Sequence, residues 1–96
     1  METFLFARFH VHPGNEEALR AAIAAVLGPT REEPGCLNID AFRSVRDPLE
    51  FYIHSRWRDM AAFEHHAALP HTQRFVNTVE PLLDHPFKVA LAEKIR

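Results

Sequence analysis

The order of the hydrophobic patterns along this chain constrains its fold more than any other feature. Alternation of apolar and polar residues, which is typical of β-strands, occurs at residues 3–12, 36–45, 50–57 and 85–95. Helical spacing occurs over residues 15–27 and again, in two pieces, from residue 60 to residue 83. The resulting order is strand, helix, strand, strand, helix, strand. It predicts an α+β fold of the ferredoxin-like type, βαββαβ, with one four-stranded antiparallel sheet.

Capping residues and helix breakers predict where the helices begin and end. Asn15 is a candidate N-cap of the first helix, and Gly28-Pro29 predicts its end, so residues 30–35 are expected to form a loop. Asp59 is expected to cap the second helix. Pro70 suits the first turn of a third helix, because a helix needs no backbone N–H donor there.

Both helical regions are expected to cover the same face of the sheet, which leaves the other face open. Over residues 50–57, one face carries Phe51, Ile53, Ser55 and Trp57, and the opposite face carries Tyr52, His54 and Arg56. Phe4 and Phe6 lie on a second face of the first strand. An open face rich in aromatic side chains is large enough to require a partner.

Length and charge limit the kinds of protein that this chain can be. Ninety-six residues form a single domain, residues 1–96, and a net charge of −2 without a basic block argues against nucleic acid or an anionic membrane as partner. No apolar run approaches the roughly 20 residues of a membrane-spanning helix, and no signal peptide is visible. The single cysteine, Cys36, excludes an intrachain disulfide. We therefore expect a cytoplasmic protein.

The segment "FEHHAALPHTQRF", residues 63–75, contains three of the seven histidines and raises the question of a metal site. His65 and His66 are adjacent, so on a helix they point about 100° apart. Two helical ligands of one metal ion normally lie three or four residues apart. His10 and His12 share a strand face, but no cysteine or paired carboxylate is near them in the sequence. Spacing within these segments therefore predicts no metal site.

Acid–base chemistry is a second interpretation of the same histidines. His66 shares a helix face with Phe63, so it is expected at the border between helix and sheet, whereas His65 is expected in solvent. His71 follows Pro70 and could approach His66 across the junction of the two helices. Either these imidazoles line a pocket and transfer protons, or His66 packs at the edge of the core and His71 lies on the surface. Both interpretations remain open from the residues alone.

Other candidate site residues have a structural interpretation beside the functional one. Trp57 ends a strand and is either a buried anchor or the wall of a pocket that stacks a planar ligand. His54 is a weaker polar candidate on the hairpin. Cys36 follows a glycine at the start of a strand and is more typical of a buried thiol than of a nucleophile. No phosphate-binding loop, dinucleotide-binding glycine motif or nucleophile elbow is present.

Two motifs resemble those of the antibiotic biosynthesis monooxygenase family. They are "PTREEPGCL" at residues 29–37 and "WRDMAAFEHHAALPH" at residues 57–71, and the resemblance covers nearly the whole chain. It implies a homodimer in which two sheets pack through their helix-free faces into an α/β barrel. Each subunit is then expected to keep a pocket between its sheet and its helices.

The resemblance also implies a reaction and the residues that perform it. Several members of the family oxygenate polycyclic aromatics or quinols with dioxygen and without flavin, haem or metal. By position in the motifs, His66 is the implied catalytic residue, and Trp57, His71, His54 and Phe63 are implied or inferred contacts of the substrate. The family commonly has a glutamate two residues before the tryptophan, where this chain has Ser55.

These observations favour a cofactor-independent monooxygenase that acts on a phenolic, quinol or polycyclic aromatic substrate. Because Ser55 replaces an acid–base partner, a non-catalytic dimeric module for ligand binding or stress response is the main alternative. An isomerase of a small keto compound is a further one, since it also needs only a positioned histidine.

Overall fold

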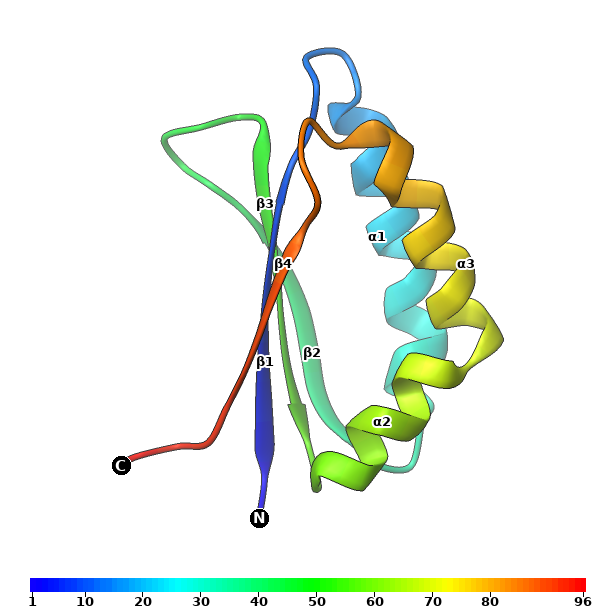
Figure 1. Cartoon of the computed structure of the whole chain (residues 1–96), viewed down its shortest axis with the longest axis vertical. Coiled ribbons are helices and arrows are strands. Elements are labelled where there is room, and N and C mark those ends of the chain that lie inside the picture. The colour runs from blue at the N-terminus through cyan, green and yellow to red at the C-terminus, as the bar shows by residue number, and fades with distance from the viewer.

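The structure, a computed structural model, describes all of residues 1–96 and has the predicted order of elements (Figure 1). The elements are β1 (Thr3–His10), α1 (Glu16–Arg31), β2 (Cys36–Arg43), β3 (Glu50–Trp57), α2 (Met60–Ala68), α3 (Pro70–Val79), the short 3₁₀ helix η1 (Glu80–Leu82) and β4 (Lys88–Ala92). The four strands form one antiparallel sheet in the order β2-β3-β1-β4. The predicted ferredoxin-like fold is thus confirmed.

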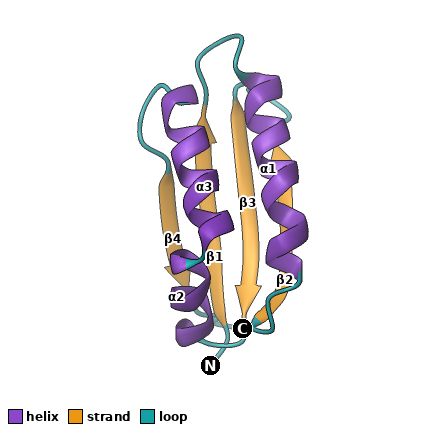
Figure 2. Cartoon of the chain, turned by 90° about the vertical axis from the view of Figure 1, so that its right-hand side faces the viewer, coloured by secondary structure: helices purple, strands orange, loops and turns teal.

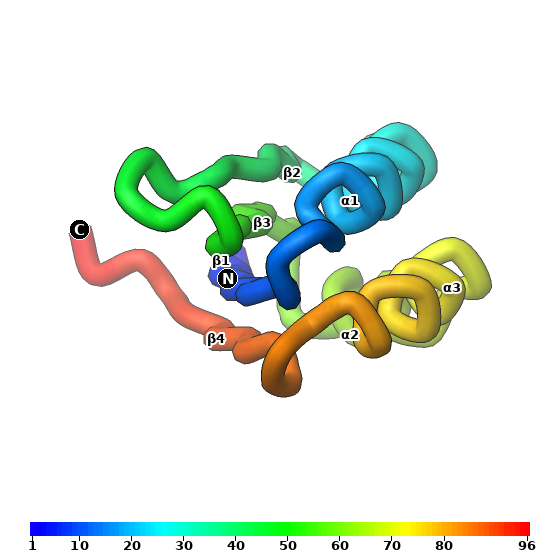
Figure 3. The backbone as a smooth tube through the Cα atoms, turned by 90° about the horizontal axis from the view of Figure 1, so that it is seen from above, coloured from blue at the N-terminus to red at the C-terminus, as the bar shows by residue number.

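All three α-helices lie against one face of the sheet, and the other face has no covering layer (Figures 1 and 3). In Figure 2, α1 runs over β2 and β3, while α3 and α2 lie one after the other nearer β1 and β4. The core fills the space between the two layers. Its buried residues include Leu5, Ala7, Phe9, Leu19, Ile23, Ile39, Phe51, Ile53 and Val79.

Helix α1 does not end at Gly28-Pro29, as its sequence predicts, but continues to Arg31 with Pro29 inside it. A proline in the last turn removes only one backbone donor, and tertiary contacts of that turn offset this loss. Thr30 is fully buried, and Arg31 Nη2 donates a hydrogen bond of 2.9 Å to the carbonyl of Ile39 on β2. The extra turn therefore brings Thr30 from the predicted loop onto the inner side of the helix.

Other ends of elements also differ from the prediction. The side chain of Asn15 does not cap α1, because its Nδ2 donates instead to the carbonyl of Leu82 at 3.1 Å. Strand β4 covers only residues 88–92 of the predicted 85–95, since only these residues pair with β1. Asp59 does cap α2, accepting a hydrogen bond of 2.8 Å from the N–H of Ala62, and α3 begins at Pro70 as predicted. None of the helices is both long and apolar enough to cross a membrane.

Candidate active site between the sheet and the helices

An apolar pocket of about 260 Å³ lies between the sheet and the helices. Seventeen residues line it, and twelve of them are hydrophobic. The apolar walls come from all four strands, from the three α-helices and from the segment before β4, and include Phe9, Ile53, Phe63, Phe75, Val76 and Phe87. The polar lining is limited to Thr30, Ser55, His66, Thr72 and Gln73. A polar atom of a ligand in this pocket could therefore bind only to one of these five side chains or to the backbone.

His66 is the only titratable residue in this lining. It lies on α2, and its side chain is 12% exposed. Its Nδ1 lies 2.8 Å from Glu33 Oε2, and the Thr72 hydroxyl lies 3.3 Å from the same nitrogen. The other ring nitrogen, Nε2, makes no hydrogen bond within the protein. One side of the imidazole is thus fixed, and the other remains available to a ligand.

Glu33 is the residue that holds this arrangement together, and its side chain is only 7% exposed. Its Oε2 accepts hydrogen bonds from His66 Nδ1 and from His71 Nε2, the latter at 2.7 Å. The short turn between α1 and β2 positions it, because the N–H of Glu33 donates to Thr30 and its carbonyl accepts from Cys36. The carboxylate therefore links α2 and α3 to the end of α1.

The surroundings of His66 favour its neutral form. Burial lowers the pKa of His66 below its ordinary value, and the hydrogen bond to Glu33 opposes this shift without cancelling it. A neutral imidazole whose Nδ1–H donates to a carboxylate keeps its lone pair on Nε2. His66 can therefore accept a proton from a molecule in the pocket.

Trp57 does not form the wall of the pocket that its sequence position suggests. Its side chain is fully buried and lies behind the lining, with its ring centroid 4.5 Å from that of His66 and 6.2 Å from that of Phe63. Its Nε1 donates a hydrogen bond of 2.9 Å to Ser55 Oγ. Trp57 thus packs against His66 and Ser55, and both of these residues reach the pocket.

His54 lies on the opposite face of the sheet and takes no part in this pocket. Side chains alternate along β3, so His54 points away from the helices when Ile53 and Ser55 point toward them. Its ring packs at 4.9 Å from the ring of Phe6 on the helix-free face. Of the other predicted contacts, Phe63 lines the pocket, and His71 reaches the site only through Glu33.

Glu33, His66 and His71 are also the one set of side chains in the chain whose ligand atoms lie close enough, within 4.8 Å of one another, to hold a metal ion. Spacing within residues 63–75 could not reveal this set, because Glu33 comes from another part of the sequence. The contacts at 2.7 Å and 2.8 Å have the lengths of charge-assisted hydrogen bonds between imidazole and carboxylate. A hydrogen-bonded His–Glu–His arrangement accounts for the geometry.

Cys36 lies near this site and is half-buried. Burial raises the pKa of its thiol, and the charge of Glu33 raises it further. A thiol with a raised pKa is mostly protonated near neutral pH, and the thiolate is the nucleophilic form. Cys36 is therefore not an activated nucleophile, in agreement with its interpretation from the sequence.

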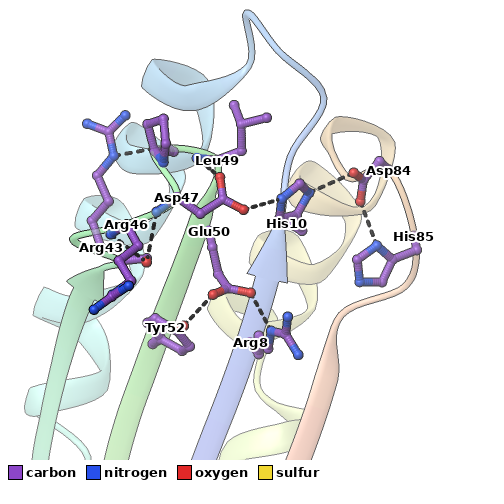
Figure 4. Close-up of polar contacts among 12 residues, drawn as sticks. Arg8, His10, Arg43, Arg46, Asp47, Leu49, Glu50, Tyr52, Asp84 and His85 are labelled. Atoms are coloured by element: carbon purple, nitrogen blue, oxygen red, sulfur yellow. Dashed lines mark hydrogen bonds and ion pairs between the residues drawn. The ribbon is translucent and has the colours of Figure 1, made fainter.

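A second polar cluster lies around the C-terminal end of β1, where the loops before β3 and before β4 meet it (Figure 4). His10 lies between two carboxylates, with Nε2 at 2.8 Å from Asp47 and Nδ1 at 2.6 Å from Asp84. Asp84 also contacts His85 at 2.6 Å. Both ring nitrogens of His10 are occupied by carboxylates, so His10 joins β1 to two loops and keeps no free nitrogen for a ligand. Nearby, Glu50 accepts hydrogen bonds from Arg8 and from Tyr52.

Comparison with known proteins identifies the relatives of the chain. Residues 4–78 match the model of a family described as antibiotic biosynthesis monooxygenase. The Mycobacterium tuberculosis protein named "Putative monooxygenase Rv0793" is 34% identical over 87 residues, which are 91% of this chain and 85% of that protein. The solved structure of Rv0793 superimposes with a TM-score of 0.95 over 100% of this chain and 97% of that chain, at 30% sequence identity.

Two further structures extend this similarity. PA3566 from Pseudomonas aeruginosa has a TM-score of 0.91 and 34% identity, and the alignment covers 99% of this chain and 95% of that chain. SnoaB from Streptomyces nogalater, described as a cofactor-independent oxygenase, has a TM-score of 0.89 over 99% of this chain and 94% of that chain. Its identity is 19%, so this similarity concerns the fold alone. The family match spans most of the chain, and the chain therefore belongs to the antibiotic biosynthesis monooxygenase family.

Proposed function

We propose that this protein is a cofactor-independent monooxygenase that oxidises a small phenolic or quinol substrate with dioxygen. One observation carries the proposal: an otherwise apolar pocket contains a single imidazole, His66, whose Nε2 is free and whose Nδ1 is held by the buried carboxylate of Glu33. Membership of a family that includes oxygenases supports the same reaction class.

The first step that we propose is removal of a phenolic proton by His66 Nε2. The resulting phenolate is electron-rich enough to reduce dioxygen directly. For a hydroquinone, one oxygen atom enters the ring, the other leaves as water, and the product is a hydroxyquinone. All four electrons that dioxygen accepts come from the substrate, so the atoms and electrons balance without a flavin or a metal ion. Glu33 would act by holding the Nδ1–H tautomer and by stabilising the imidazolium that forms.

The pocket volume favours a substrate of one or two rings over a larger polycycle. An apolar cavity of about 150 Å³ accommodates benzene, and ligand pockets usually start at about 300 Å³. The pocket here, at about 260 Å³, lies between these values. A hydroquinone or a naphthohydroquinone has a suitable size, and its flat apolar surface matches the aromatic walls.

A homodimer is part of this proposal, with the helix-free faces of two sheets packed together. Phe6 and Phe42 lie on that face and are 51% and 52% exposed. The absence of any helix on that side (Figure 3) leaves these side chains in solvent in a single chain. The pocket lies on the other side of the sheet, so the two pockets of such a dimer would stay separate.

Oxygen uptake is the direct test. Purified protein is mixed with hydroquinone or 1,4-dihydroxynaphthalene in an oxygen electrode, with EDTA present and spontaneous oxidation subtracted. We expect uptake by the wild-type protein and little uptake by His66→Ala, whereas His65→Ala, which changes the neighbouring exposed histidine, should match the wild type. Equal rates for the wild type and His66→Ala would refute the role of His66. No uptake with any phenol would favour the binding module, and product formation without oxygen would favour an isomerase.

A further inference from the structure

The buried carboxylate of Glu33 has one oxygen atom that the protein leaves without a partner. Its Oε2 accepts hydrogen bonds from His66 and His71, whereas Oε1 is buried and makes no hydrogen bond. A buried carboxylate oxygen without a hydrogen bond or a cation costs free energy, because it has lost its contact with water. The proton transfer proposed above uses Oε2 alone, so it does not explain why Oε1 is buried without a partner.

The donor atoms around this carboxylate form a set that suits a transition-metal ion. Glu33, His66 and His71 each offer one ligand atom, and these atoms lie within 4.8 Å of one another. Two histidines and one glutamate hold Zn²⁺ in several enzymes, with a water molecule in the fourth position. Ligands at about 2.0–2.2 Å from a tetrahedral ion lie about 3.3 Å apart, so the present contacts of 2.7 Å and 2.8 Å need to lengthen by only about 0.5 Å.

An ion can approach these atoms from solvent without entering the apolar pocket. A hollow of about 220 Å³ lies between the turn after α1 and α2, and Glu33 and His65 are among the residues that line it. His71 lines a second hollow, between α1 and α3. Arg58 also lines the first hollow, but it is 62% exposed and pairs with Asp59, so solvent and this carboxylate screen its charge. A hydrated cation therefore has a route to Glu33.

We propose that Glu33, His66 and His71 bind one Zn²⁺ ion. The ion takes the place of the two protons that now lie between the imidazoles and the carboxylate, and it gives Glu33 Oε1 a cation as its partner. Each neutral imidazole then carries its proton on the nitrogen that faces away from the ion. For His66 this nitrogen is Nε2, which loses the lone pair that it presents to the pocket.

Zinc therefore inhibits the proposed oxidation, because His66 can no longer accept a phenolic proton. This consequence rests on the proposed function, whereas binding of the ion does not. The two are tested separately.

Binding of zinc is measured on untagged protein from which metal has been removed with EDTA and the EDTA then dialysed away. Isothermal titration calorimetry with ZnCl₂ near neutral pH should show one ion per chain and a dissociation constant in the micromolar range. Loss of a residue that only orients a ligand costs roughly 10–100-fold in metal affinity, so loss of a ligand in His71→Ala or Glu33→Gln should weaken binding at least about tenfold. His12→Gln removes an exposed histidine outside the site and is the matched control. Mg²⁺, which prefers oxygen ligands, should not bind.

A second measurement reports on His66 directly. The ¹⁵N chemical shifts of the histidine rings should show that zinc moves the proton of His66 from Nδ1 to Nε2, while the ring of His12 keeps its shifts. Bound zinc with an unchanged tautomer of His66 would overturn the assignment of His66 as a ligand.

The outcomes separate the metal site from the proposed reaction. No binding at micromolar zinc, or an affinity unchanged in His71→Ala, would overturn the site. If Glu33→Gln does not fold, as judged by circular dichroism, His71→Ala gives the answer alone, since its side chain is less buried. Zinc binding by a protein that takes up no oxygen in EDTA would retain the site and reject the oxygenase. Oxygen uptake by a protein that binds no zinc would do the reverse.

Discussion

Glu33 Oε2 lies 2.8 Å from His66 Nδ1, although the two residues are 33 positions apart in the chain. This contact connects the turn after α1 with α2 and fixes which nitrogen of His66 reaches the pocket. The same oxygen accepts from His71 on α3. A single buried carboxylate therefore determines both the orientation of the candidate base and the way in which three helices meet.

Replacing His66 should reduce the rate of oxygen uptake more than the affinity for the substrate. General-base catalysis by a positioned histidine contributes about 10²–10⁴-fold, so His66→Ala should lower kcat within that range. The apolar walls stay in place, so KM should change by less than about tenfold. Steady-state oxygen-electrode kinetics would measure both, with His65→Ala as control. A normal kcat in His66→Ala would rule out proton transfer by this residue.

Glu33→Gln should affect the reaction through His66. The carboxylate raises the pKa of His66 against the effect of burial, so its loss should lower that pKa further and move the acidic limb of the kcat/KM profile to lower pH. A glutamine amide can also donate to Nδ1 and leave the proton on Nε2, which would lower kcat by roughly 10²–10⁴-fold. Kinetics as a function of pH and ¹⁵N chemical shifts of the histidine ring would show both changes. An unshifted profile with a normal rate would mean that Glu33 only stabilises the fold.

Addition of a single methyl group at Gly35 is predicted to destabilise the protein. A Cβ atom added there would lie 2.3 Å from the Cβ of Ala62 on α2, which is far inside contact distance. Gly35→Ala should therefore push α2 from the sheet and destabilise the protein by about 1–3 kcal/mol. Gly28→Ala is the matched control, because a Cβ there meets nothing within 4 Å, and it should stabilise α1 by about 0.5–1 kcal/mol. Urea unfolding would measure both, and equal stabilities would contradict the close approach.

The cluster around His10 should make stability depend on pH. Hydrogen bonds that His10 donates to Asp47 and Asp84 raise its pKa above the ordinary value, and His85 packs beside the ring. A group with a raised pKa stabilises the fold fully below its unfolded pKa of about 6.5, and this contribution disappears as pH rises through the folded pKa. His10→Gln should thus lower Tm more at pH 5.5 than at pH 8.5. His12→Gln, at an exposed histidine outside the cluster, is the matched control. Identical losses of Tm at both pH values would argue against this linkage.

Asp47 and Asp84, which contact His10, should lose their contribution to the stability of the fold at acid pH. A backbone hydrogen bond from Leu49, followed by the contact with His10, lowers the pKa of Asp47. Burial would raise the pKa of Asp84, but the hydrogen bonds with His10 and His85 outweigh it, and the net shift is downward. Their stabilisation is present above an unfolded pKa of about 3.9 and fades as pH falls through the folded values. Tm of Asp84→Asn should therefore approach that of the wild type near pH 2–3, and a constant difference would contradict the shift.

The open face of the sheet predicts association of two chains. Phe6→Glu places a charge at the centre of that face, so it should convert a homodimer into a monomer without loss of secondary structure. Sedimentation velocity at micromolar concentration would show the change in mass. Glu64→Lys, at an exposed position on α2, controls for the change in charge. A wild-type monomer at that concentration would refute the dimer.

The sequence predicted the order of the elements well, because alternating and helical spacing directly reflect which side of each element is buried. It predicted the pocket side of His66 for the same reason, from the shared helix face with Phe63. His54 is a candidate substrate contact in the sequence, although the alternation along β3 already places it on the face opposite to Ser55, and it does not line the pocket. Trp57 has two interpretations from the sequence, a buried anchor or a pocket wall, and the structure shows the buried anchor, since nothing in a sequence tells a lining residue from the one supporting it.

Glu33 and Thr30 could not be identified from the sequence. Glu33 belongs to a loop whose Pro-Gly turn is visible, but the burial of its carboxylate depends on α2 and α3 folding over it. The sequence predicts a loop at Thr30, because Pro29 is typical of a helix end. Contacts with the sheet extended the helix beyond that proline, and such long-range contacts are absent from a local pattern. Residues that take their role from distant segments thus remain hidden to sequence reasoning.

Trp57 is the only tryptophan in the chain, and its indole touches both His66 and Ser55. When the protein is excited at the long-wavelength edge of tryptophan absorption, its fluorescence therefore comes from this one buried indole beside the pocket. A change in the charge of His66, or in the hydrogen bonding of the Ser55 hydroxyl, alters the electric field around the indole and therefore its fluorescence. The protein carries a built-in optical reporter of its own site, and occupancy of the pocket can be followed without any label.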